Sequence, residues 1–148
     1  MSNQEEKPFA KAIELKQWQD PVEDVAVVFS EGTCNVYFFV ADSELLGKLS
    51  FAGATAIRSV RTEVAPYMDR ECKFSSYILE VFCSPWPTEI EFGFYTEQAR
   101  EFLHKKRHLL VMGHDIYHEI LCLDYSETYL SKADAEYLYA EKVLRRQP

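Results

Sequence analysis

The fold of this chain is decided by the stretch His108-Leu-Leu-Val-Met-Gly113-His114-Asp115-Ile-Tyr-His-Glu-Ile-Leu-Cys-Leu123, in which two apolar runs flank a Gly-His-Asp turn. This pattern is typical of a β-hairpin. The stretch Val25–Val40 repeats it, with β-branched and aromatic residues alternating on either side of a turn at Ser30–Thr33. Apolar side chains occupy both faces of Cys34–Ala41, so we expect this strand to be covered on both sides.

The rest of the chain predicts further strands and helices. Strands are expected in Lys48–Arg61, with a bend at Gly53, in Tyr77–Cys83 and in Glu89–Tyr95. Helices are expected at Ala10–Gln19, near 97–106 and near 131–146, the last with a capping box at Ser131–Asp134. Residues Asp124–Thr128 are expected to form a loop.

Together these elements predict a mainly β protein of the α+β class. We expect an antiparallel β-sandwich or open barrel of about six to eight strands, with the helices near 97–106 and 131–146 at its periphery. The length of 148 residues favours a single domain, 1–148. Residues 1–24 are polar and contain two prolines, so we expect part of this N-terminal segment to fray.

Composition excludes several classes of protein. Apolar residues make up 47% of the chain, which argues against intrinsic disorder. The formal net charge of −8 disfavours nucleic-acid binding, because contacts with phosphate need clustered Lys and Arg. We expect no membrane partner either, since no apolar run is long enough to span a bilayer.

The four cysteines, Cys34, Cys72, Cys83 and Cys122, form no Cys-x-x-Cys pair. No signal peptide is visible, so we expect a cytoplasmic protein whose cysteines are free thiols. Cys83 ends a predicted strand without a neighbouring base that would lower its pKa, so it is predicted to be a buried structural thiol.

Two histidines four residues apart, His114 and His118, suggest a metal site at first sight. On a strand, however, positions i and i+4 lie roughly 13 Å apart, too far to share one ion. We therefore expect no metal, and interpret His114 as a turn residue and His118 as a cross-strand neighbour of His108 or Leu110. His118 stays open as a binding residue.

Charged side chains supply two further candidates. Arg58 and Arg61 would point to opposite faces of an extended segment. A surface salt bridge between Arg61 and Glu63 is the ordinary interpretation, and an arginine facing a cleft is the functional one. The basic cluster His104–His108 could bind a phosphate or an acidic patch, but the C-terminus of a helix also favours cations there.

Trp86 lies between Pro85 and Pro87. A tryptophan held in this way is either a plug in the core under the end of the sheet or an exposed anchor for a partner. The sequence leaves both alternatives open.

Three segments, Leu49–Glu63, Tyr77–Trp86 and His108–Leu123, occur in a suggestive order. A strand containing an arginine precedes a strand that ends in Ser84-Pro-Trp86, and a closing hairpin follows. This order resembles small bacterial proteins of unknown function, some of them immunity-like proteins that neutralise toxins. The resemblance covers roughly residues 45–125 and implies no catalytic residues.

These observations predict a non-enzymatic protein-binding or accessory protein, immunity-like in its specific version. Its partner is expected to be a protein, with a basic one suiting the acidic surface, and a homo-oligomer stays open. The candidate binding residues are Trp86, Arg58, Arg61 and His118. No cofactor is expected, because the chain contains no glycine-rich phosphate-binding motif. The alternative is a small enzyme or ligand-binding domain with a pocket between the sheets that uses Arg58 or His118.

Overall fold

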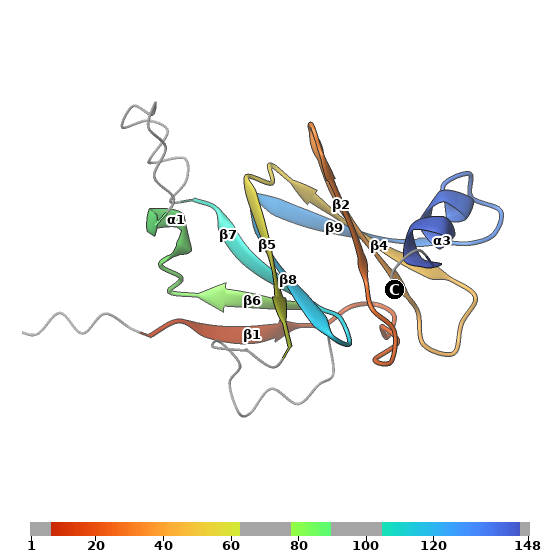
Figure 1. Ribbon diagram of the computed structural model, residues 1–148, viewed down its shortest axis with the longest axis horizontal. Helices are drawn as coiled ribbons and strands as arrows, with labels where there is room; N and C mark the ends of the chain where they lie inside the picture. Colours follow the sequence, from red (N-terminus) through yellow and green to blue (C-terminus); the bar gives the residue numbers. More distant parts are fainter. Residues whose placement is uncertain (1–6, 63–77, 90–104, 146–148) are drawn as a thin grey trace, which may run out of the picture.

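The computed structural model describes residues 7–62, 78–89 and 105–145 of the chain (Figure 1). These residues form nine strands in two antiparallel sheets, together with two short helices. The predicted mainly β, sandwich-like α+β fold is therefore confirmed. The described residues alone contain one strand more than the upper end of the predicted range.

The larger sheet has five strands in the order β1-β6-β7-β8-β5. Their bounds are β1 Phe9–Ile13, β5 Ala56–Arg61, β6 Ile78–Phe82, β7 Arg107–Met112 and β8 Ile116–Cys122. The hairpin predicted from the His108–Leu123 stretch is formed by β7 and β8, which pair from Arg107↔Cys122 to Met112↔Tyr117.

The smaller sheet has four strands in the order β2-β3-β4-β9. Their bounds are β2 Ala26–Ser30, β3 Thr33–Phe39, β4 Leu46–Ala52 and β9 Asp124–Leu130. The predicted hairpin within Val25–Val40 is formed by β2 and β3 around the turn at Glu31 and Gly32. Gly32 has a φ of 80°, a conformation that glycine adopts at no steric cost.

The main hydrophobic core lies between the two sheets. Alternate residues of each strand face inward, as the two-residue period of a strand requires. The largest contributors from the smaller sheet are Phe38, Leu49 and Phe51, and those from the larger sheet include Leu109 and Ile120. At Gly47 a side chain would collide with the ring of Phe38, which explains why glycine is needed in the middle of β4.

The second helix, α3 (Tyr137–Arg145), covers the outer face of the smaller sheet (Figure 1). Its buried residues Tyr137, Ala140 and Leu144 pack on that sheet. One contact of the predicted capping box is present, since the Ser131 amide donates to the Asp134 carboxylate at 2.7 Å, but the Asp134 amide donates to the Ser131 carbonyl and not to its hydroxyl. The helix nevertheless begins only at Tyr137, because residues 132–136 form turns, so only the later part of the predicted 131–146 helix is helical.

The N-terminal segment differs from the prediction. No helix forms in Ala10–Gln19, because Phe9–Ile13 pairs with β6 over five residue pairs as β1. Further along, the Asp20 amide donates to the Phe39 carbonyl at 2.8 Å. Residues 9–13 and 19–20 are thus tied to the two sheets, so any frayed part of residues 1–24 does not include them.

The segment expected to be a loop after β8 is also a strand. Residues 124–130 pair with β4 over seven residue pairs as β9. Tyr125 and Tyr129 alternate toward the core, which a loop would not require. The predicted strand Glu89–Tyr95 and helix 97–106 fall mostly on residues 90–104, which lie outside the described residues; Glu89 itself ends α1 (Trp86–Glu89).

Among the described residues, no helix is long and apolar enough to cross a membrane.

Candidate functional site

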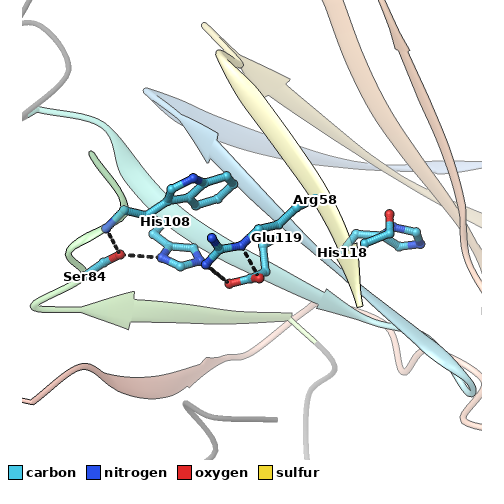
Figure 2. Close-up of polar contacts among 7 residues, drawn as sticks. Arg58, Ser84, His108, His118 and Glu119 are labelled. Carbon is cyan, nitrogen blue, oxygen red and sulfur yellow. Dashed lines mark hydrogen bonds and ion pairs between the residues drawn. The ribbon is translucent and has the colours of Figure 1, made fainter. Parts of the chain in front are cut away.

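A chain of polar contacts lies on the outer face of the five-stranded sheet and joins Ser84, His108, Glu119 and Arg58 (Figure 2). We call these four residues the polar relay. The Ser84 hydroxyl lies 2.6 Å from His108 Nδ1, and His108 Nε2 lies 2.7 Å from Glu119 Oε1. Arg58 holds the same carboxylate with two bonds, from Nε at 2.5 Å and from Nη2 at 3.1 Å.

Strand register brings the relay together. Arg58 on β5 is directly opposite Glu119 on β8. Glu119 in turn is opposite Leu110 on β7, so His108, two residues earlier, is its diagonal neighbour on the same face. This face alternates with the core face, so polar side chains can gather on it without entering the space between the sheets.

Ser84 is positioned by the abrupt end of β6. Cys83 has a φ of 58°, an uncommon value for a non-glycine residue, and turns the chain sharply between β6 and α1. Pro85 follows and removes a backbone donor. The Ser84 oxygen accepts the Trp86 amide at 3.2 Å, so the hydroxyl links the first residue of α1 to the sheet.

Trp86 covers the relay. Its side chain is only 6% exposed, and its ring meets the His108 ring edge-on at a centroid distance of 4.8 Å. The Arg58 guanidinium carbon lies 4.2 Å from the centre of the Trp86 ring, a cation–π contact. Of the two alternatives for Trp86, this burial fits the core plug.

Burial and charge oppose each other at Glu119, which is 2% exposed. Removal from water raises the pKa of the carboxyl group, but hydrogen bonds and charge from His108 and Arg58 outweigh this effect and hold the pKa below its ordinary value. The carboxylate can only accept hydrogen bonds, so His108 Nε2 carries a proton toward it. In a neutral imidazole, Nδ1 is then the acceptor for the Ser84 hydroxyl.

No local sequence pattern indicates the relay, because its members belong to four separate segments. The predicted cross-strand neighbour of His118 is His108 or Leu110, whereas His118 pairs with Val111. This correction amounts to a slip of one residue from the Leu110 pairing, and such a slip turns every side chain of the strand to the other face. Glu119, rather than His118, consequently shares a face with His108.

The four candidate binding residues therefore separate. Arg58 and Trp86 belong to one cluster, whereas Arg61 is exposed at the end of β5. His118 lies apart from the relay (Figure 2) and bonds through Nδ1 to the Ser59 hydroxyl at 2.7 Å. Burial lowers the pKa of His118, although the charge of Asp24 works in the other direction.

His114 and His118 do not converge. His114 Nδ1 approaches the Pro21 carbonyl at 3.3 Å from the exposed turn between β7 and β8. Within residues 7–62, 78–89 and 105–145, no three His, Cys, Asp or Glu side chains are grouped as metal ligands.

The basic cluster is likewise divided among different partners. Lys106 donates to the Gly53 carbonyl at 2.5 Å. Arg107 makes two bonds to Glu80, at 2.9 and 2.8 Å, and one to Asp124 at 3.0 Å. These lysine and arginine side chains connect strand ends rather than forming a shared phosphate site.

Cys34 and Cys122 are buried free thiols. Burial raises the pKa of Cys34 to about 11 and that of Cys122 to about 12. Cys83, however, is exposed, so the prediction of a buried structural thiol is wrong. The sharp turn after β6 is the reason, since Cys83 leaves the regular alternation of the strand there.

A second feature is an open hollow of about 440 Å³ at one end of the sandwich. Phe29, Phe51 and Ala54 line it together with Cys34 and the β2–β3 turn. Phe29 is 47% exposed, whereas Phe51 is buried beneath it. Glu31, in the turn, adds a carboxylate to the lining. We call this feature the apolar hollow.

Comparison of the chain with known protein families, with curated proteins and with solved structures found no match. The functional conclusion therefore depends on the geometry of the polar relay and the apolar hollow.

Proposed function

We propose that this chain is a protein-binding protein of the accessory or immunity-like kind, which binds a basic protein partner at the apolar hollow. The observation that carries the proposal is the exposure of Phe29 beside a hollow with an apolar floor. An aromatic residue at the rim of such a hollow is a typical anchor for a partner side chain.

Phe29, rather than Trp86, is the proposed anchor for the partner. Trp86 is only 6% exposed and packs on His108 and Arg58, so little of its surface remains for a partner. Phe29 is 47% exposed. An anchor of this kind contributes most when a partner removes it from water, which requires exposure in the free protein.

The position of Phe29 on an edge strand gives the partner a second way to bind, by pairing with that strand. β2 pairs only with β3 within its four-stranded sheet, and its sequence Ala-Val-Val-Phe-Ser contains neither a charge nor a proline. The edge strand β5, in contrast, contains Arg58 and Arg61. Charged residues and proline are common protections against edge pairing, so β2 is suited to accept an extended segment of a partner.

Charge supports a basic partner. The chain has a formal net charge of −8, and Glu31 lies at the rim of the apolar hollow. Opposite charge on the partner would raise the association rate, and salt would reduce that effect. We place the binding in the cytoplasm, because Cys34 and Cys122 are free thiols, as a reducing compartment favours.

Photo-cross-linking tests the proposal directly. A benzophenone amino acid replaces Phe29 in one version of the protein. In the control it replaces Leu138, which is 59% exposed on helix α3, on the other face of the smaller sheet. We expect one basic protein to be cross-linked from position 29 and not from position 138. Equal cross-linking from both positions, or cross-linking of position 29 only to a second copy of this chain, would contradict the proposal.

A further inference from the structure

We propose that Ser84, His108 and Glu119 form a nucleophilic site at which Ser84 takes an acyl group from a small carboxylic ester. This activity goes beyond partner binding and uses a different part of the molecule. The order of contacts is that of a serine nucleophile, a histidine base and a carboxylate that orients the base.

The distances meet the requirement for an activated serine. The Ser84 hydroxyl is 2.6 Å from His108 Nδ1, and His108 Nε2 is 2.7 Å from Glu119. Both fall within the range of about 2.6–3.2 Å expected between a nucleophile, its base and the group that orients the base. When His108 is neutral with its proton on Nε2, facing Glu119, the Nδ1 lone pair is directed at the Ser84 hydroxyl.

Burial prevents the base from changing orientation. The side chains of His108 and Glu119 are only 1% and 2% exposed. Arg58 holds Glu119 from the other side with two hydrogen bonds, and Trp86 packs against the imidazole. In such surroundings the carboxylate stabilises an imidazolium more strongly than it would in water.

Ser84, in contrast, lies partly open to solvent at a strained turn. It is half-buried, between the exposed residues Cys83 and Pro85. The φ of 58° at Cys83 is a conformation that costs free energy in a non-glycine residue. Strain of this kind clusters at functional sites, and here it presents a serine between a strand and a helix, above its base.

The same protein contains a natural comparison. Ser59 also bonds to a histidine, His118, through Nδ1 at 2.7 Å. Among the described residues, however, no carboxylate bonds to the other nitrogen of His118. Ser59 therefore has a histidine without the orienting group, and differs from Ser84 in the feature that the proposal requires.

The reaction balances without a cofactor. The Ser84 oxygen bonds to the carbonyl carbon of the ester while its proton passes to His108 Nδ1. The bond from that carbon to the leaving oxygen breaks, and the leaving alkoxide takes the proton from Nδ1. Water then attacks the acyl-serine and gives a proton to Nδ1; the carbon–Ser84 oxygen bond breaks, and Ser84 recovers the proton, leaving a carboxylic acid.

The test is reaction of the wild-type protein with a fluorophosphonate probe, with the labelled residue located by mass spectrometry. We expect the probe on Ser84 and not on Ser59. Unlabelled Ser84, or equal labelling of the two serines, would overturn the proposal, and neither result depends on a variant that must fold.

Variants then test whether Ser84 reacts because the relay activates it or only because it is accessible. Glu119→Gln should slow labelling of Ser84 by about 100-fold, the order expected when a base loses its function. Ser59→Ala should label like the wild type, and circular dichroism should show that each variant is folded. Hydrolysis of p-nitrophenyl acetate should fall to the background rate in Ser84→Ala. A folded Glu119→Gln protein that labels at the wild-type rate would contradict the role of the relay.

Discussion

Replacement of Glu119 by Gln removes one negative charge from the polar relay and leaves the side-chain volume nearly unchanged. The carboxylate accepts hydrogen bonds from Arg58 at 2.5 and 3.1 Å and from His108 at 2.7 Å. Removing one member of a buried ionic pair costs about 3–5 kcal/mol when the remaining group stays buried. Arg58 is 37% exposed and can regain water, so we expect a smaller loss, about 2–4 kcal/mol.

Urea unfolding at neutral pH measures this loss. In a chain of this size each kcal/mol lowers Tm by about 2–4 °C, so thermal unfolding should agree. The matched control is Glu80→Gln. Glu80 also accepts two bonds from an arginine, Arg107, but it is 18% exposed. We expect the control to cost less than about 1 kcal/mol.

The pH dependence supplies a second readout. The pKa of Glu119 is lower in the folded protein than its ordinary value of 4.5. The unfolded chain therefore binds this proton more readily, and the contribution of Glu119 to stability is present above about pH 4.5 and lost as pH falls through the folded pKa. In Glu119→Gln, the part of the acid-induced loss of stability that comes from protonation of Glu119 should be absent. A loss below about 0.5 kcal/mol at neutral pH, or an equal loss in Glu80→Gln, would refute the reasoning.

Four further outcomes follow from individual residues. Burial lowers the pKa of His118, so the stabilisation of the fold by neutral His118 should decrease as pH drops below 6.5. In His118→Gln, the free energy of unfolding measured with urea should depend less on pH in that range. Gly47→Ala should lower the free energy of unfolding by about 1–3 kcal/mol, because the new methyl group would meet the Phe38 ring. Trp86→Ala should cost about 3–5 kcal/mol; a nearly unchanged Tm would show that the ring is not a core plug. In native thiol titration Cys83 should react at once and the two buried thiols only on unfolding, whereas denatured protein without reductant should show all four cysteines free.

Much of the fold could be predicted from periodicity. The alternation in His108–Leu123 and in Val25–Val40 identified one hairpin in each of the two sheets. The two strands that were not predicted, β1 and β9, are both edge strands. Edge strands have only one neighbour, so their sequences carry weaker apolar alternation, and long-range pairing decides their structure.

The polar relay could not be predicted, because it depends on the pairing register of β7 with β8. Ser84 and His108 are 24 residues apart, and His108 and Glu119 are 11 apart. Only the exact pairing of β7 with β8 determines whether Glu119 or His118 shares a face with His108. Turn lengths and apolar patterns allow for a slip of one residue, and the sequence contains no local motif to correct it.

The apolar hollow also lay beyond sequence reasoning. Phe29 belongs to a strand whose alternation predicts an inward-facing side chain, yet it is 47% exposed. It lies next to the β2–β3 turn, and residues from three strands and this turn line the hollow. Such a site depends on how several strands and a turn are placed relative to each other, and the sequence of any one segment does not specify this.

The most direct test of the proposed function is the affinity of the partner cross-linked at position 29 for three proteins: wild type, Phe29→Glu and Leu138→Glu. An anchor residue contributes about 2 kcal/mol or more, so Phe29→Glu should raise Kd by at least about 30-fold, while Leu138→Glu should leave it within about threefold. Higher salt should slow association of the wild type. Equal affinities of Phe29→Glu and wild type, with both proteins folded, would contradict the account.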